Sequence, residues 1–335
     1  MASGKAARFA LTGAILLAVL FLSLVLSLRF GVTDFTVREL LSLLAGEGSG
    51  MRREILVNLR LPRFFAGALT GGSLAVCGAV MQAAVRNPMA DPYLMGVSSG
   101  ATLGATLCIL TFGGRVGLLG LSGSAFAGAM ACSLLISLIS FGTRANALLM
   151  ILIGLAINAL CSSLGSLLVY LSFDANLLRN LVFWLMGSLA PATWDQLPFL
   201  FWINVPGLVF FCSRSRNLNL IMLGDDEAGS LGLSPGNFRL LSLGVVALMT
   251  ASCVSCFGMI GFVGIIIPHV LRFFFGSNHI YLLPLSFLAG ASFLVSVDLL
   301  ARSAHPSEIP LGVITGIIGS PFFVWILLRR WRTGR

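Results

Sequence analysis

The stretch RLPRFFAGALTGGSLAVCGAVMQ at residues 60–82, followed closely by RNPMADPYLMGVSSGATLGA at residues 86–105, decides the fold of this chain. Each half contains an apolar run close to the roughly 20 residues that a helix needs to cross a bilayer. Between the runs lies a polar turn stiffened by Pro88 and Pro92, because each proline fixes its own φ and restricts the preceding residue. Glycines recur at four-residue intervals, which lets membrane helices approach closely. We therefore predict two closely packed membrane helices joined by a rigid turn.

The rest of the chain has the composition of a membrane protein. Of its 335 residues, 57% are hydrophobic and only 10% are charged, and the mean hydropathy is +0.99. Soluble domains carry about 25% charged residues. A water-soluble fold of this length could not hide so much apolar surface. We therefore expect an all-α, polytopic membrane protein in which residues 1–335 form a single transmembrane domain.

Charge and side-chain usage exclude several functions. Lys5 is the only lysine and no strand precedes it, so a P-loop is absent and another chain would have to hydrolyse ATP. The formal net charge of +9 comes mainly from arginines scattered at the ends of apolar runs, which is typical of loops that set membrane orientation. We expect no nucleic-acid partner. Cys253 and Cys256 form an isolated C-x-x-C inside an apolar run, and the histidines lack a ligand spacing, so we predict no metal site.

Apolar runs predict about ten membrane-spanning helices. An even number of spans places both termini on one side of the membrane, and the basic tail at 329–335 favours the cytoplasmic side. The polar connection at 29–59 is expected to hold a short interfacial helix, and the connection at 172–194 a partial helix. The predicted spans cover residues 9–28, 62–84, 92–112, 116–141, 146–171, 195–212, 238–257, 259–275, 281–301 and 309–328.

Four blocks together resemble one known family, and the two opening stretches form the first of them. The two opening stretches are followed by GFVGIIIPHVLR at 261–272, DLLAR at 298–302 and EIPLGVITGIIGSPFFVWILL at 308–328. In this order they resemble the iron-siderophore, haem and cobalamin family of ABC importer permeases over nearly the whole chain. The departures are small: Met89 stands where that family usually has Leu, and Ser320 where it usually has Ala.

The resemblance implies a function and a set of partners. Residues 1–335 would form the transmembrane permease domain of an importer, with the translocation pathway between two copies of the chain. Two ATPase subunits would hold ATP and Mg²⁺, this chain would bind no cofactor, and an external binding protein would deliver the substrate. That substrate would be a large metal chelate, an iron-siderophore or haem and less readily cobalamin. The assembly would lie in the bacterial inner membrane, in contact with its lipids.

The resemblance also implies three groups of site residues. Asn87 and Met89 match positions that narrow the cytoplasmic mouth of the pathway as a gate. Arg60, Arg63 and Arg302 match arginines that meet glutamates on the two lobes of the binding protein. The stretch GDDEAGSLG at 224–232 is a short helix candidate, because its acids suit a helix N-terminus and its last glycine a helix end. It resembles the loop that docks into an ATPase. The coupling residues would be Gly224, Asp225, Asp226, Glu227, Ala228, Ser230, Leu231 and Gly232.

Each of these assignments has a simpler alternative. The acidic stretch could be an ordinary solvated turn, and Asn87 could merely cap the third span. The arginines could anchor phosphate headgroups of the lipids. Asp298 could be a proton-relay group in the membrane, but Arg302 lies four residues further on the same helix face, so we predict that the two side chains form a structural pair.

The importer permease has two alternatives. A secondary transporter of a small organic solute would need no ATPase but usually carries ionisable groups near the bilayer midplane, and the predicted spans offer almost none. An intramembrane enzyme would need a nucleophile with a base, or a metal centre, and the spans contain neither pattern. We therefore predict that this chain has no catalytic residues and is not an enzyme.

Overall fold

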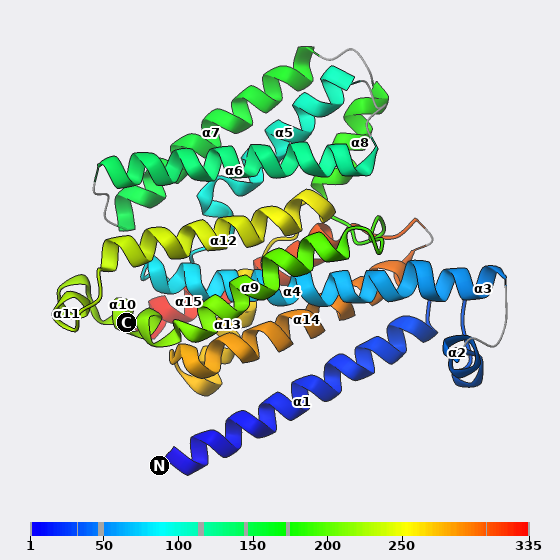
Figure 1. Ribbon diagram of the computed structural model, residues 1–335, viewed down its shortest axis with the longest axis horizontal. Coiled ribbons are helices and arrows are strands. Elements are labelled where there is room, and N and C mark those ends of the chain that lie inside the picture. The colour runs from blue at the N-terminus through cyan, green and yellow to red at the C-terminus, as the bar shows by residue number, and fades with distance from the viewer. Residues whose placement is uncertain are drawn as a thin grey trace.

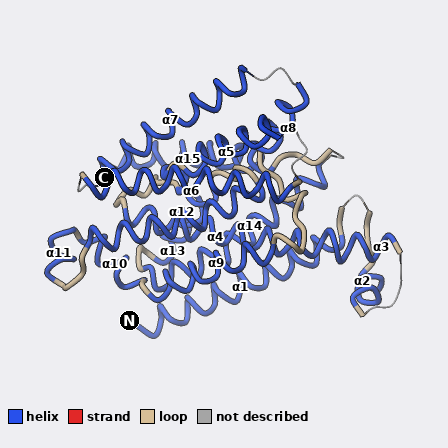
Figure 2. Tube along the Cα trace, turned by 45° about the horizontal axis from the view of Figure 1, so that its top comes forward, coloured by secondary structure: helices blue, strands red, loops and turns tan. Residues whose placement is uncertain are grey.

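The computed structural model describes residues 2–31, 33–45, 50–112, 117–143, 147–171, 175–305 and 307–333, which form helices joined by turns and loops (Figures 1 and 2). No strand occurs among these residues. The helices are α1 (Ala2–Arg29), α2 (Val37–Leu44), α3 (Met51–Glu54), the π-helical segment η1 (Ile55–Arg60), α4 (Leu61–Ala84), the 3₁₀ turn η2 (Pro92–Met95), α5 (Val97–Phe112), α6 (Leu118–Gly142), α7 (Ala147–Leu171), α8 (Ala175–Leu185), α9 (Leu197–Ser213), α10 (Ser215–Leu223), α11 (Asp225–Ser230), α12 (Pro235–Phe257), α13 (Val263–Phe275), α14 (His279–Ala304) and α15 (Leu311–Thr333).

Helix α4 lies at the centre of the bundle. The most apolar part of the helix that ends at Ala84 is 83% buried, whereas that of α1 is only 6% buried. Helices α12, α13 and α14 all pack on α4, and α1 packs on the far side of α14 (Figure 1). At the opposite edge α5, α6 and α7 pack together, and α12 joins them to α4.

Glycines allow the closest helix contacts, as their spacing predicts. A Cβ atom on Gly71 would meet the carbonyl oxygen of Gly290 on α14, and a Cβ atom on Gly78 would overlap the backbone of Gly264 on α13. Gly100 of α5 is packed against Gly128 of α6 in the same way. Because the hydrophobic effect gives little drive between helices inside a bilayer, such backbone contacts are a main source of packing energy there.

The ten predicted spans each coincide with a helix in the structure. Within the described part of the chain, six helices are long and apolar enough to cross a membrane, and the bent pair α9–α10 allows a seventh crossing. Helices α5, α13 and the apolar part of α15 are shorter, so ten complete crossings stay a prediction. Residues 116 and 146, at which two predicted spans begin, and the last two residues of the basic tail lie outside the described residues.

The start of the second span differs from the prediction. We placed it at Pro62, but the helix already begins at Met51 and runs without a break to Ala84. Proline lacks the N–H that an α-helix needs in its interior. Here the π-helical segment η1 directly precedes Pro62, and an altered hydrogen-bond register of this kind accommodates a residue that would otherwise interrupt the helix.

The predicted helices in the polar connections are both present. Helix α2 lies in the first connection and begins with a capping box, in which Thr36 and Glu39 bond each other's backbone N–H groups. These hydrogen bonds from Thr36, together with the nearby Arg52, hold the pKa of Glu39 below its ordinary value. Helix α8 is the partial helix expected between 172 and 194.

Candidate functional site: gate loop, coupling helix and polar pocket

The predicted gate residues lie in a tight turn after the end of α4, which we call the gate turn (residues 87–93). Asn87 is exposed, and its side-chain oxygen accepts a hydrogen bond from the Met89 N–H (2.9 Å). Asn87 therefore stabilises the turn itself, whereas Asp91 caps the next helical turn by accepting from the Tyr93 N–H (2.8 Å). The alternative that Asn87 caps the third span is thus wrong. The gate role of Asn87 and Met89 stays a prediction.

The side chain of Tyr93 connects this turn to the interior. The Tyr93 hydroxyl donates to the Ile260 carbonyl (3.0 Å) and lies 3.2 Å from the Ile260 N–H, which ties the turn to the connection between α12 and α13. Burial raises the pKa of the Asp91 carboxyl to about 6, while the Tyr93 N–H acts in the opposite direction. The turn is therefore held on both sides of Pro92.

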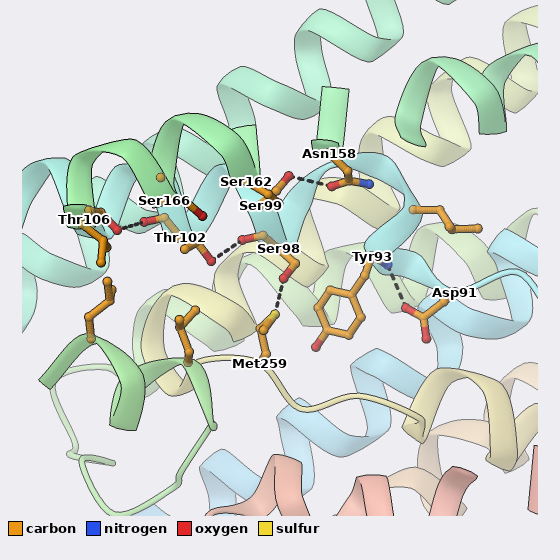
Figure 3. A pocket seen from close by; sticks show the side chains of 15 residues that line it. Asp91, Tyr93, Ser98, Ser99, Thr102, Thr106, Asn158, Ser162, Ser166 and Met259 are labelled. Carbon is orange, nitrogen blue, oxygen red and sulfur yellow. Dashed lines mark hydrogen bonds between the residues drawn. The ribbon is translucent and has the colours of Figure 1, made fainter. Parts of the chain in front are cut away.

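A pocket whose mostly apolar surface carries several polar groups, here called the polar pocket, lies beside this turn, between α5, α7 and α8 (Figure 3). Asp91 and Tyr93 of the turn belong to its lining. Its volume is about 630 Å³, and among the residues that the structure describes its lining includes a single carboxylate, Asp91, and no Lys, Arg or His. Hydroxyl and amide groups dominate its polar surface. They belong to Ser98, Ser99, Thr102, Thr106, Asn158, Ser162 and Ser166.

The hydrogen bonds of these groups leave part of their capacity free for a ligand. Thr102 donates to the Ser98 carbonyl (2.9 Å) and Thr106 donates to the Thr102 carbonyl (2.8 Å), so each hydroxyl oxygen can still accept. Ser99 donates to the Asn158 side-chain oxygen (2.6 Å), which links α5 to α7. The pocket can therefore offer several hydrogen-bond acceptors to an uncharged polar molecule.

The sequence reasoning missed this pocket, although a signal for it exists. Polar residues recur every four positions on two apolar helices, at 98, 102 and 106 on α5 and at 158, 162 and 166 on α7. A four-residue spacing places such side chains on one helix face. Two such stripes in neighbouring membrane helices indicate a polar pathway.

The acidic stretch forms the short helix that its pattern predicts. Helix α11 begins after Gly224 at φ +144° and is followed by Gly232 at φ +84°, both backbone conformations that favour glycine. The helix has two unlike faces. Asp226 and Glu227 are exposed, whereas Ala228 is buried. Docking of the exposed face into an ATPase stays a prediction.

The first acid of this helix turns toward the rest of the chain. Asp225 Oδ1 accepts from Arg239 of α12 (2.8 Å) and lies 3.2 Å from an Nη atom of Arg86, which directly precedes the gate turn. Arg239 also donates to the carbonyl of Ala84, the last residue of α4 (2.8 Å). One carboxylate therefore connects α11, α12 and the end of α4.

The predicted docking arginines lie together, in what we call the arginine cluster: Arg60, Arg63, Asp298, Arg302 and Glu308. Arg63 of α4 pairs with Asp298 of α14 (2.7 Å) and with Glu308 (3.0 Å). Arg302 lies 3.8 Å from Asp298, which confirms the predicted pair. The closer partner of Asp298 is Arg63, which the sequence alone did not indicate. Asp298 is thus held between two arginines.

Two arginines of the cluster hold the end of α1. Arg302 donates to the carbonyl (2.6 Å) and the hydroxyl (2.7 Å) of Ser27, and Arg60 donates to the carbonyls of Leu28 and Thr33. The last carbonyls of a helix lack partners within it, and positive charge is favourable there. Arg60 and Arg302 therefore cap α1 and fix it to α4 and α14.

The burial of the three predicted docking arginines affects whether they can contact a binding protein. Arg60 and Arg302 are only 5% and 7% exposed, and the Arg63 side chain is 12% exposed. Their guanidinium groups donate to groups of this chain, so direct ion pairs with a binding protein would require them to leave these partners. Docking by these arginines stays a prediction. Anchoring to lipid headgroups meets the same obstacle.

We expect Arg63→Ala to destabilise the protein strongly. Removing one partner of a buried ion pair leaves an uncompensated charge and costs about 3–5 kcal/mol. Asp298 would keep only the more distant Arg302. Arg52→Ala is the matched control, because Arg52 also pairs with one glutamate but both side chains are largely exposed. Thermal unfolding in detergent should show a large loss for Arg63→Ala and almost none for Arg52→Ala. Equal losses would contradict a structural role of the arginine cluster.

Known proteins match most of this chain in sequence and in fold. The model of the FecCD transport family matches residues 16–329. The hemin transport system permease protein of Yersinia pestis is 39% identical over 280 residues, covering 82% of this chain and 84% of that protein. The vitamin B12 import system permease protein of Vibrio cholerae is 37% identical over 282 residues, covering 84% of this chain and 85% of that protein. A solved structure of a metal-chelate type ABC transporter, in an inward-facing conformation, has a TM-score of 0.85 and 34% identity, and the match covers 95% of this chain and 98% of that chain.

The helical fold and the length of the match define a membrane-spanning transport permease of the ABC type, and not an enzyme. The chain belongs to the FecCD transport family.

Proposed function

We propose that this chain forms one half of the translocation pathway of an ATP-driven importer for a large metal chelate. The observation that carries the proposal is the polar pocket between α5, α7 and α8, whose lining includes Asp91 and Tyr93 of the gate turn. Polar side chains inside a membrane bundle bond a neighbouring helix or face a cavity, and those in the lining of this pocket face a cavity. A second copy of the chain supplies the other half of the pathway, and residues 1–335 act as one permease domain.

The partners follow from the lack of a P-loop in this chain and from its family. ATP and Mg²⁺ bind to two separate ATPase subunits, which dock on α11, and this chain binds no cofactor. An external binding protein delivers the substrate to the opposite mouth. Ten spans place both termini in the cytoplasm of a bacterial cell, with the permease in the inner membrane.

The substrate is an iron-siderophore or haem, and less readily cobalamin. Relatives named for hemin and for vitamin B12 support this class. The lining of the pocket adds a physical argument, because its described residues include several hydrogen-bonding groups and no cationic side chain. Such a surface suits a bulky chelate whose metal charge is already neutralised by its ligand.

The alternative of a secondary transporter has less support. Proton- or ion-coupled transport uses ionisable groups that are free to change charge inside the membrane. Asp298, an acid within a membrane helix, is paired with Arg63 and Arg302. Asp91 remains in the pocket, so we include an ion-gradient control in the experiments.

Uptake measurements in a strain that lacks this chain test the substrate class. Cells carrying the wild-type chain should take up one of three probes, an iron-loaded hydroxamate siderophore, haemin or cobalamin, and the deletion strain should not. Equal uptake of all three probes with and without the chain would contradict the proposal.

We expect Ser162→Leu to reduce that uptake at least about tenfold, because the larger side chain would fill the pocket and remove one of its hydroxyl groups. Ser163→Leu is the matched control: Ser163 is the next residue on α7 and does not line the pocket. One residue along a helix points about 100° away. Equal uptake by the two variants would show that the pocket is not part of the pathway.

A further inference from the structure

The end of helix α1 marks the level of one membrane surface. The apolar part of α1, Ala7–Arg29, has 23 residues and is only 6% buried in the bundle, so most of its surface faces lipid. An α-helix of this length spans about 34 Å, close to the roughly 30 Å of the hydrocarbon core. Arg29 and Phe30 are both exposed where this stretch ends. They therefore lie at the level of the lipid headgroups, where basic and aromatic side chains are favoured.

Helix α2 is held at this same level by its packing against the end of α1. The Phe35 N–H bonds the Arg29 carbonyl (3.0 Å), which closes the turn between the two helices. One face of α2 is buried in a small apolar core with residues of α1 and η1, made of Leu28, Phe35, Leu40, Leu43 and Leu56. Figure 1 shows α2 nearly end-on and α1 from the side, so α2 lies across α1, as a helix in the plane of a membrane surface does.

The opposite face of α2 combines apolar side chains with one arginine. Val37 and Leu41 are 53% and 65% exposed, and they lie one turn apart on the same side of the helix. Arg38 is exposed beside them and forms no ion pair with any residue that the structure describes. Glu39 does not neutralise it, because the Glu39 carboxylate pairs with Arg52. This face, which we call the α2 face, is therefore both apolar and positively charged.

An anionic phospholipid matches the α2 face in both respects. A guanidinium group binds phosphate through strong charge-assisted hydrogen bonds, and apolar side chains of a surface helix enter the boundary between headgroups and acyl chains. We propose that Val37, Arg38 and Leu41, together with Arg29, bind an anionic phospholipid of the leaflet in which α1 ends. Asp34 is the one acid in the sequence between the two arginines, so positive charge prevails.

This assignment gives the exposed arginines a role that the buried ones cannot fill. Arg60 and Arg302 donate to groups of this chain and are almost fully buried. Arg29 and Arg38 are exposed beside a helix whose apolar surface faces lipid. The α2 face would bind lipid whatever the chain transports, so its assignment can fail while the proposed function stands.

Spin labels test the depth of the α2 face in proteoliposomes that contain dioleoyl phosphatidylglycerol. A nitroxide on Leu41→Cys, in a chain that also carries Cys212→Ser, should be more accessible to oxygen than to a water-soluble nickel complex, because oxygen concentrates in hydrocarbon. Arg53→Cys is the matched control. Arg53 is also exposed, but none of the described residues three or four positions away is an exposed large apolar one. Its label should favour the nickel complex. The same preference for nickel at position 41 would overturn the proposal.

Native mass spectrometry of the purified chain tests lipid binding itself. Arg38→Gln should weaken binding of the first phosphatidylglycerol about fivefold, which is the usual contribution of one arginine near an anionic membrane surface. Arg53→Gln should stay within about twofold of wild type, and Arg38→Lys should retain most of the binding. Inorganic phosphate should not compete, because it lacks acyl chains. If Arg38→Gln fails to fold, Leu41→Ser decides, because it leaves the charge in place and removes an apolar contact.

Three results would overturn the proposal. One is equal phosphatidylglycerol binding by wild type, Arg38→Gln and Leu41→Ser. Another is displacement of the lipid by inorganic phosphate, which would make the site a simple anion site. The third is weaker affinity of Arg38→Gln for the binding protein with lipid binding unchanged, which would assign the α2 face to a protein partner.

Discussion

Replacing both Asp226 and Glu227 with arginine is expected to abolish ATP-driven uptake while leaving expression and membrane insertion intact. These two acids are exposed on α11, and neither is ion-paired within the described residues. A change from two negative to two positive charges on a docking face turns attraction into repulsion, which costs several kcal/mol between closely placed charges. Uptake in cells should fall below about a tenth of wild type, and the purified variant should no longer stimulate its ATPase.

Asp195→Arg is the matched control for this charge reversal. Asp195 is also exposed, but it lies in the loop before α9, away from α11. Its replacement should leave uptake near the wild-type level. Normal transport by the Asp226→Arg and Glu227→Arg double variant would show that α11 is an ordinary surface helix and would end its assignment as the coupling element.

A disulfide between the two copies of a Met89→Cys variant should stop uptake completely. Met89 lies in the gate turn and is partly exposed, and in the proposed dimer the two turns close the pathway from opposite sides. A covalent bond would prevent the separation that passage of a large chelate requires. The crosslink should form in the resting state, appear as a dimer on a non-reducing gel, and remove uptake.

Addition of a thiol reductant to the same sample is the control. Uptake should return as the dimer band disappears, which separates the effect of the bond from the effect of the substitution. The native cysteines are buried except for the half-buried Cys212, so the wild-type chain should not crosslink under these conditions. Failure of position 89 to crosslink in any state would contradict a pathway between two copies.

The helices were largely predictable because their signal is local. Each apolar run is long relative to the polar turns that separate it from the next, and all ten runs coincide with helices. The short helix α11 was predictable for the same reason, since its acids and flanking glycines are adjacent in sequence. The early start of the second span was not, because the polar residues Arg52, Arg53 and Glu54 hide the helix that continues into it.

The tertiary contacts of the charged groups could not be predicted from the sequence. Asp298 and Arg302 are four residues apart and could be paired by helix geometry, but Arg63 is 235 positions away from Asp298. The burial of the arginine cluster likewise depends on the end of α1, which folds back against it. The link from Asp225 to Arg86 arises only in the folded chain, where Arg239 of α12 bonds both Asp225 and the carbonyl of Ala84 at the end of α4.

Reconstitution gives the most direct test of the central claim that this chain is the permease of an ATP-driven importer. Liposomes should contain the chain, its ATPase and its binding protein, and the measured quantity should be accumulation of the probe identified by the uptake experiments. We predict uptake that requires ATP and is lost when the P-loop lysine of the ATPase is replaced by alanine. Uptake by the chain alone, driven by a proton or sodium gradient and unaffected by that replacement, would contradict the account.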